Sequence, residues 1–371
     1  MSSGFGTTRR VMIGCGGTGG HIFPGIALGQ ELREMGCEVL FVGNRDGMEA
    51  SLIPGEGFAF KGINVQKLYR KISLSNLLFP FLLASATLSS RSMMKKFKPK
   101  GVICTGGFVS GPVALAAITL KVPLFFHESN SYPGMTTRYL AKYTNITFTS
   151  FSSTQKYLSG TNVRELGIPL PKRKNAGRIQ DLREIGLSPE KPIILITGGS
   201  QGSQAINSAV AEALPKLIEK GFQIIWQTGK TGFSAFTKRF KEQKGLYLFD
   251  FSPQLPSYFL LAQVAITRAG ALTIAELEQS RLPAVLIPLP TAAENHQYYN
   301  ALEQQEKGLA LILQQKDLTP ENLITAIHEI LDAHEDYKSR LATLPPNNAS
   351  LEITRQILEY LDKEKSHAGK N

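Results

Sequence analysis

The sequence has few cysteines and no recognisable metal-binding pattern. Its 371 residues include only Cys15, Cys37 and Cys104, none of which belongs to a C-x-x-C pair. This scarcity excludes the disulfide framework of small secreted proteins and a cysteine-based zinc site. No His, Cys, Asp or Glu cluster has the spacing of metal ligands, so we expect neither a metal nor another cofactor. The three thiols are therefore predicted to be free and buried, in a reducing compartment.

Long hydrophobic runs are also missing. The longest, residues 77–84, is too short to cross a bilayer, which requires about 20 residues. Residues 1–10 have no apolar core of the signal-peptide type, so we expect the chain to stay in the cytosol. Basic residues flank the apolar run within the 70–100 region. An apolar patch ringed by Lys and Arg predicts contact with an anionic membrane surface. The same pattern fits a helix packed inside its own domain with a solvated basic face.

Acidic residues are scarce in the first half of the chain. Residues 1–167 hold 18 Lys and Arg against 8 Asp and Glu, whereas residues 168–371 hold 23 against 22. A basic half indicates an anionic partner, such as nucleic acid, an anionic membrane or a phosphorylated substrate. We find no zinc finger, helix-turn-helix or aromatic RNA-binding pattern, so we expect no nucleic-acid partner.

Strand–helix units fill both halves of the sequence. Short apolar runs that end in turn residues are typical of buried parallel strands. In the first half we predict strands at 10–14, 38–43, 101–104, 122–126 and 146–148, and helices at 20–35, 74–97, 111–120 and 134–142. In the second half we predict strands at 193–196, 222–227, 246–249, 263–267 and 284–287, and a helix at 205–218.

This pattern predicts an α/β fold with two Rossmann-like parallel-sheet domains that face each other across a cleft. The prolines that follow Leu166 mark a linker. We place the domains at 1–167 and 175–345, with the linker at 168–174. The remaining residues, 346–371, contain an amphipathic helix at 351–361, for which packing against the first domain is one option.

A glycine-rich turn, Gly14–Gly20, lies between the first strand and the first helix. Glycines let the backbone approach a ligand closely, and a helix N-terminus favours anions. His21 on the same turn is able to accept a proton near neutral pH. The glycine spacing also fits the dinucleotide fingerprint, but the second strand runs into Asn44 and Arg45 instead of ending in the expected acid, and Asp46 comes later. Arg45 suits a 2′-phosphate, so an NAD(P)-dependent oxidoreductase stays an alternative, disfavoured by the missing acid.

Two further turns follow strands of the first half, at Thr105–Pro112 and Phe126–Asn130. His127 and Glu128 fit either a structural pair or groups that assist an acceptor hydroxyl.

In the second half, the pattern of Thr267–Glu276 predicts the end of a strand, a glycine turn and the start of a helix. Backbone N–H groups at 271–273 suit a diphosphate, and Glu276 suits a ribose diol, although it also fits a simple helix-capping carboxylate. The segment 294–297 offers amide and imidazole groups to sugar hydroxyls.

Together these motifs resemble the MurG family of bacterial peptidoglycan glycosyltransferases, which have the GT-B fold. The matching segments occur in the family's order and span most of the chain: Gly16–Gly25, Gly106–Pro112, His127–Asn130, Gly198–Ser203, Arg268–Glu276 and His296–Ala301. The resemblance implies transfer of N-acetylglucosamine (GlcNAc) from UDP-GlcNAc to lipid I, undecaprenyl-diphospho-N-acetylmuramoyl-pentapeptide, giving lipid II. It also implies a peripheral protein on the cytoplasmic face of the bacterial plasma membrane.

The resemblance carries over residue by residue to expected UDP-GlcNAc contacts. Glu276 would hold the ribose, Gln297 would read the GlcNAc hydroxyls, and the main chain at Ser252 would read uracil. The full expected set is Thr18, Gly19, Gly20, Asn130, Ser200, Ser252, Ala271, Leu272, Thr273, Glu276, His296 and Gln297.

Three features depart from the family pattern. The linker arginine is absent at Pro171, with Lys172 or Arg173 as its substitute. An acidic pair is replaced by Pro253 and Gln254, and the first of two glutamines is His296.

For the reaction we expect His21 to be the general base, with Glu128 as the alternative, and no metal. Helix N-termini would hold the charge of the departing diphosphate. Two rivals remain besides the oxidoreductase. One is another GT-B enzyme that acts on a membrane lipid such as diacylglycerol. The other is a nucleotide-sugar-binding scaffold without activity.

Overall fold

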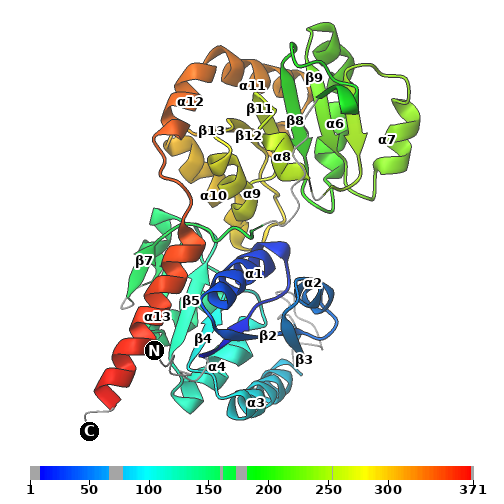
Figure 1. The fold of residues 1–371 in the computed structure, drawn as a ribbon. Coiled ribbons are helices and arrows are strands. Elements are labelled where there is room, and N and C mark those ends of the chain that lie inside the picture. The colour runs from blue at the N-terminus through cyan, green and yellow to red at the C-terminus, as the bar shows by residue number, and fades with distance from the viewer. Residues whose placement is uncertain (1–8, 67–77, 159–161, 173–181, 253, 369–371) are drawn as a thin grey trace, which may run out of the picture. The chain divides into compact units, whose positions relative to one another are not determined.

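The computed structural model describes residues 9–66, 78–158, 162–172, 182–252 and 254–368. The chain forms two compact units (Figure 1). One comprises Met1–Lys172 together with Asn347–Asn371, and the other comprises Arg173–Pro346. Each unit is built around one parallel sheet with helices on its faces. The fold class predicted from the sequence, two Rossmann-like parallel-sheet domains, is therefore confirmed.

The first sheet has the strand order β3-β2-β1-β4-β5-β6-β7, and every pairing in it is parallel. Successive residues of its central strand face opposite sides: Val11 and Ile13 join one buried cluster, whereas Met12 joins the other. Both faces are covered, which explains why the central strands are continuous apolar runs. The strands are β1 Arg10–Gly14, β2 Glu38–Asn44, β3 Ala59–Ile63, β4 Gly101–Cys104, β5 Leu124–Glu128, β6 Ile146–Thr149 and β7 Val163–Glu165.

The last helix of the chain completes the first unit. It packs on α1, and its side chains Ile353, Ile357, Leu358 and Leu361 lie in the same buried cluster as Val11. The helices of this unit are α1 Gly19–Glu34, α2 Glu49–Gly55, α3 Phe79–Phe97, α4 Ser110–Leu120, α5 Met135–Leu140 and α13 Ala349–Ala368. Within the described ranges, no helix has both the length and the apolar composition that a membrane crossing needs.

The second sheet repeats this arrangement with the order β10-β9-β8-β11-β12-β13, again all parallel. Its strands are β8 Ile193–Thr197, β9 Gln223–Gln227, β10 Leu246–Phe249, β11 Val264–Thr267, β12 Ala284–Leu286 and β13 Ala310–Ile312. Its helices are α6 Gln204–Glu219, α7 Phe233–Arg239, α8 Leu255–Phe259, α9 Ala271–Gln279, α10 His296–Glu306, α11 Pro320–Asp332 and α12 His334–Ala342.

The structure differs from the sequence-based expectation at several elements. The strand expected at 122–126 is β5, which continues to Glu128 because His127 and Glu128 pair with β6. Three strands were not predicted, β3, β7 and β13, and all three lie at sheet edges. β3 and β7 include polar or charged residues, so their hydrophobic pattern is weak. β13 is apolar but only three residues long, too short for its pattern to identify a strand. Of the helix expected at 74–97, the described part begins at Phe79, and residues 74–77 fall outside the described ranges.

Both sheets reverse their winding direction at one place. In the first sheet β1 lies between β2 and β4, and in the second β8 lies between β9 and β11. Ligands of open α/β sheets bind outside the carboxyl ends of the strands at such a switch point. The glycine-rich turns found in the sequence follow β1, β4 and β8, and the Arg268–Gly270 turn follows β11. The topology therefore places them at the two expected sites.

Candidate active site

The turn after β1 forms the N-terminal end of α1. Gly17 has a φ of +95°, a left-handed conformation that favours glycine. Thr18 is the residue before the helix, and its carbonyl accepts the N–H groups of His21 (3.0 Å) and Ile22 (3.1 Å). The Nδ1 atom of His21 lies 3.3 Å from the Thr18 hydroxyl. His21 is thus held at the first helical turn by both backbone and side chain.

The turn after β4 packs directly against the first. A Cβ on Gly106 would lie 2.6 Å from Cδ2 of His21, and a Cβ on Gly107 would lie 2.1 Å from the carbonyl oxygen of Gly16. The hydroxyl of Thr105 donates to the carbonyl of His21 (2.7 Å). Both glycines have positive φ, +101° and +79°. The two turns therefore form one packed group around His21, in which a larger residue would clash.

Glu128, at the end of β5, holds its own loop. Its Oε1 accepts the backbone N–H (3.1 Å) and the side-chain amide (3.3 Å) of Asn130. Its Oε2 accepts the Gly134 N–H (3.1 Å) and the Thr137 hydroxyl (2.6 Å). The side chain is 3 % exposed. A buried carboxylate with four donors around it stabilises the start of α5, and this geometry favours His21 over Glu128 as the proton acceptor.

His127 is buried beneath the same loop. Its Nε2 atom lies 3.1 Å from the Gly167 carbonyl and its Nδ1 atom 3.5 Å from the Ser129 hydroxyl. Burial lowers the pKa of His127 to about 4, although the Gly167 carbonyl and Glu128 oppose this shift. His127 is therefore neutral at physiological pH and connects β5 to the segment that leaves the first unit. Of the two sequence-based interpretations, the geometry favours the structural one.

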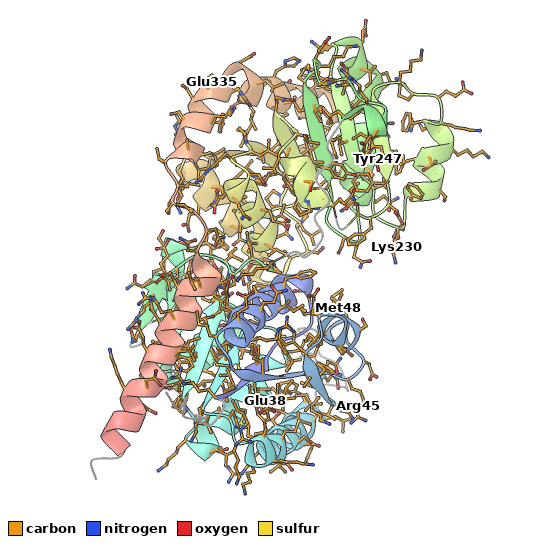
Figure 2. All side chains as sticks on the ribbon, in the orientation of Figure 1. Glu38, Arg45, Met48, Lys230, Tyr247 and Glu335 are labelled. Atoms are coloured by element: carbon orange, nitrogen blue, oxygen red, sulfur yellow. The ribbon has the colours of Figure 1, made fainter. Side chains whose placement is uncertain are left out.

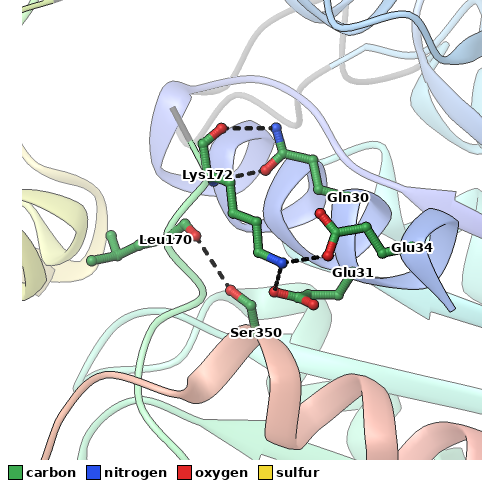
Figure 3. Close-up of polar contacts among 6 residues, drawn as sticks. All are labelled: Gln30, Glu31, Glu34, Leu170, Lys172 and Ser350. Atoms are coloured by element: carbon green, nitrogen blue, oxygen red, sulfur yellow. Dashed lines mark hydrogen bonds and ion pairs between the residues drawn. The ribbon is translucent and has the colours of Figure 1, made fainter. Parts of the chain in front are cut away.

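The segment around Lys172 is fixed to the first unit (Figure 3). Its ammonium lies 2.8 Å from Oε1 of Glu31 and 2.6 Å from Oε2 of Glu34. The Gln30 side chain makes two bonds to its backbone, accepting from the Lys172 N–H (2.8 Å) and donating to its carbonyl (3.3 Å). Hydrogen bonds to both carboxylates raise the pKa of Lys172. The ammonium is thus committed to α1, and Arg173, the other expected substitute for the family's arginine, lies outside the described residues.

Ser350 at the start of α13 holds the same segment from the other side. Its hydroxyl donates to the Leu170 carbonyl (3.3 Å), and the side-chain amide of Asn347 donates to the Ile168 carbonyl (3.1 Å). The outgoing and returning stretches of chain are therefore fastened together within the first unit.

In the second unit, the turn after β8 leads into α6. Gly202 has a φ of +79°, and a Cβ there would lie 2.1 Å from the Thr228 carbonyl oxygen. The hydroxyl of Ser203 accepts from the Ile206 N–H and so caps α6. Ser200, an expected contact of UDP-GlcNAc, is exposed in this turn.

Arg268 directly follows β11 and joins three strand ends of the second sheet. It donates to the Ser203 hydroxyl (2.7 Å), to the carbonyls of Ile287 (3.1 Å) and Pro288 (3.2 Å), and to Oε1 of Gln315 (2.6 Å). Among the residues that the structure describes, it forms no ion pair. Burial lowers the pKa of this guanidinium. The sequence analysis assigns Arg268 no role. A charged residue directly after a buried strand nevertheless indicates a group that needs hydrogen-bond partners and is therefore a candidate for holding a site together.

The residues of α9 and α10 that are expected to contact UDP-GlcNAc lie at or near the start of each helix. Ala271, Leu272 and Thr273 form the first turn of α9, and Glu276 lies on the next turn. His296 is the first residue of α10, with its Nδ1 atom 2.6 Å from the Ala293 carbonyl.

Gln297 and Ser252 are held by neighbouring segments. The side-chain oxygen of Gln297 accepts from the Leu289 N–H (3.0 Å). Ser252 follows β10, where its hydroxyl accepts from the Gln254 N–H (3.1 Å) and its own N–H donates to the Gln227 side chain (3.4 Å).

The expected site residues thus fall into two groups, one beyond the carboxyl ends of the strands of each sheet. Thr18, Gly19, Gly20 and His21 lie together in the first unit, where the Ser129 hydroxyl also reaches the Gly20 carbonyl (3.3 Å). Glu128 ends β5 on the same sheet and Asn130 follows it, and the remaining expected residues belong to the second unit. Over the described ranges, no cluster of three or more His, Cys, Asp or Glu side chains is arranged to hold a metal ion.

Comparison with known proteins agrees with this division. Residues 11–149 match the glycosyltransferase family 28 N-terminal domain, and residues 193–354 match the family 28 C-terminal domain. A protein of Exiguobacterium sp. named UDP-N-acetylglucosamine--N-acetylmuramyl-(pentapeptide) pyrophosphoryl-undecaprenol N-acetylglucosamine transferase is 37% identical over 356 residues, covering 95% of this chain and 99% of its own. A protein of the same name from Lactococcus lactis subsp. lactis is 34% identical, covering 90% and 93%.

A solved structure extends the similarity to the whole fold. The crystal structure of Acinetobacter baumannii MurG superposes with a TM-score of 0.78 at 27% identity, covering 95% of this chain and 99% of that chain. Similarity over nearly the full length, in sequence and in fold, includes both switch-point turns. This chain belongs to the MurG family of glycosyltransferase family 28.

Proposed function

We propose that this protein transfers GlcNAc from UDP-GlcNAc to the 4-hydroxyl of the muramoyl sugar of lipid I, which yields lipid II and UDP. The names of its relatives support the donor and the acceptor. The observation that carries the proposal is the packed pair of glycine turns that presents His21 at the carboxyl end of the first sheet.

The second unit would bind the donor. The N–H groups at the start of α9 suit the diphosphate, whose negative charge is favoured at a helix N-terminus. Glu276 would accept hydrogen bonds from the ribose diol, and Gln297 would read the GlcNAc hydroxyls. Arg268 supports this site indirectly, because it holds the α6 cap and the Pro288 segment that precedes the Gln297 contact.

The first unit would bind the acceptor and supply the base. An imidazole nitrogen of His21 takes the proton of the acceptor hydroxyl while that oxygen attacks the anomeric carbon on the face opposite UDP. The bond from the anomeric carbon to the diphosphate breaks, and both electrons leave with UDP, so the configuration inverts. The helix N-terminus in the second unit stabilises the charge that develops on the diphosphate, which requires no metal.

The basic first unit suits an anionic lipid substrate at a membrane. Along α3, Phe81 is 74% exposed and Leu88 is 66% exposed, and Leu78 before the helix is 59% exposed. Lys95 and Lys96 lie in the last turn of the same helix. Apolar side chains beside lysines favour binding to an anionic bilayer surface, here the cytoplasmic face of the plasma membrane. Residues 70–77 of the proposed contact region, 70–100, fall outside the described ranges.

The test is transfer of radiolabelled GlcNAc to a short-chain lipid I analogue, with UDP-glucose and diacylglycerol as competing donor and acceptor. We expect labelled disaccharide-lipid, and a His21→Ala variant that loses most of its kcat while it retains UDP binding. Labelling of diacylglycerol instead of lipid I would favour the alternative membrane-lipid glycosyltransferase. Near-normal turnover by His21→Ala would exclude this histidine as the base.

A further inference from the structure

We propose that Glu49 is a positioning residue for His21: its buried carboxylate holds the turn on which the imidazole is presented. This inference rests on the proposed function only in that it assigns the base role to His21. The sequence gives Glu49 no role, because it begins a short helix beyond the second strand rather than ending that strand.

The carboxylate occupies a cage formed by three glycines from different segments. Glu49 is 0% exposed. A Cβ on Gly16 would lie 2.1 Å from its Oε1, a Cβ on Gly43 would lie 2.6 Å from its Cγ, and a Cβ on Gly47 would lie 2.3 Å from its Oε2. Real Cβ atoms do not come this close, so each of the three positions must lack a side chain for the carboxylate to fit. The backbone of the first glycine turn is therefore shaped around this one side chain.

Two backbone N–H groups bind the carboxylate. Oε1 accepts from Asn44 at the end of β2 (2.9 Å), and Oε2 accepts a longer bond from Gly17 (3.4 Å). Among the described residues, no ion pair neutralises Glu49. A buried carboxylate without a cation is costly and persists when fixed donors compensate it. Here the donors connect the end of β2 to the turn after β1.

A short path leads from this carboxylate to the imidazole. Gly17 directly precedes Thr18, whose carbonyl accepts the His21 N–H and whose hydroxyl lies against His21 Nδ1. The carbonyl of Gly16 packs against Gly107, and the neighbouring Gly106 packs against the imidazole of His21. A shift of the Gly16–Gly17 peptide would therefore move both groups that orient His21, namely Thr18 and the Gly106–Gly107 turn.

The segment between β2 and α2 carries Glu49 into this cage. Figure 2 labels two of its residues, Arg45 and Met48, on the loop that leads into α2. The Arg45 N–H donates to the Ile63 carbonyl (3.0 Å), and the Gly47 N–H donates to the Asn44 carbonyl (3.2 Å). These bonds anchor the loop to the edge strand β3 and to the end of β2, so the backbone from which the Glu49 side chain extends is held in place.

Glu49→Gln is the informative variant. It keeps the shape of the side chain, but in either orientation of the amide one of the two backbone N–H groups meets an NH₂ group instead of an oxygen. We expect kcat to fall by about 10- to 100-fold, the loss typical of a misplaced catalytic group, with the KM for UDP-GlcNAc within about twofold of wild type. The matched control is Glu303→Gln, the same exchange at a 6% exposed carboxylate in the second unit. We expect it to retain wild-type kcat.

A double variant separates positioning from general loss of structure. If Glu49 acts through His21, then Glu49→Gln in a His21→Ala background lowers the residual kcat no further. A folded Glu49→Gln protein with wild-type kcat, or an undiminished effect in the His21→Ala background, overturns the inference. Should Glu49→Gln fail to fold, as judged by circular dichroism, the same two readings are made with Glu49→Asp, which is too short to reach both N–H groups. Wild-type turnover by His21→Ala alone would instead refute the base assignment of the proposed function.

Discussion

At the scale of single residues, burial decides what the titratable groups beside the site do. Glu128 and His127 look like catalytic groups in the sequence, yet Glu128 receives four donors and His127 lies between carbonyl and hydroxyl groups. Whether a side chain faces a cavity or its own loop depends on tertiary packing, which spacing along the chain does not encode. The position of His21 at the start of α1 was predictable, because a strand, a glycine run and a helix period are local patterns; its role as the base stays a prediction.

His127 leads to a prediction about pH. Its pKa is about 4 in the folded protein and about 6.5 when unfolded, so below pH 6.5 the unfolded chain binds a proton that the folded one does not. The stability contributed by neutral His127 is therefore complete above pH 6.5 and is lost as the pH falls toward 4. Between pH 7.5 and pH 5.0 we expect a loss of about 2 kcal/mol in the free energy of unfolding of the first unit.

Urea unfolding at these two pH values measures this loss. The control is His127→Gln, which removes the titrating group and should lose about 2 kcal/mol less than wild type over the same interval. Equal losses in the two proteins would show that His127 does not titrate as its burial requires.

At the scale of elements, the glycine turns are predictable and the groups that hold them are not. A strand, a glycine run and a helix period are local patterns, so the turns after β1, β4 and β8 were expected where they are found. Arg268 and Glu49 act through bonds to segments distant in sequence, Ser203 and Gln315 for the arginine and Gly17 for the glutamate. The edge strands were missed for a related reason, since β3 and β7 are defined by the neighbours they pair with.

The contact between the two turns of the first unit predicts opposite effects at two nearby glycines. Gly107→Ala would place a Cβ 2.1 Å from the Gly16 carbonyl oxygen at a φ of +79°, so we expect a loss of about 2–5 kcal/mol in stability and of most activity. Gly111→Ala adds a Cβ in α4 whose nearest neighbour is the Thr136 hydroxyl at 4.0 Å. Alanine favours a helix, so we expect Gly111→Ala to be neutral or to stabilise by up to about 1 kcal/mol. Thermal melts and transfer assays of both variants test the pair, and a tolerated Gly107→Ala would contradict the packed arrangement.

At the scale of the whole molecule, the chain builds its first unit from both ends. Strands β1 to β7 form the sheet, yet α13 supplies side chains to the cluster around Val11 and Ile13, and Asn347 and Ser350 fasten its start to the outgoing segment. Two-domain organisation was evident from the repeated strand–helix pattern. The sequence leaves the place of the last helix open, because an amphipathic helix has an apolar face but no sequence signal for the surface that covers it.

This arrangement predicts that damage to α13 weakens the first unit and spares the second. Ile357 is 0% exposed in the first unit's core, so Ile357→Ala should cost about 2–5 kcal/mol there. The single tryptophan, Trp226, is fully buried in the second unit, so its fluorescence reports that unit alone, whereas far-ultraviolet circular dichroism reports both. In Ile357→Ala we expect the first unit to unfold at a lower urea concentration, seen as a change in circular dichroism without a change in fluorescence. The urea midpoint of the Trp226 fluorescence change should stay at its wild-type value. Leu351→Ala, at a 43% exposed position of the same helix, should shift neither. A Trp226 midpoint that falls as far as the dichroism transition would mean that the two units unfold as one.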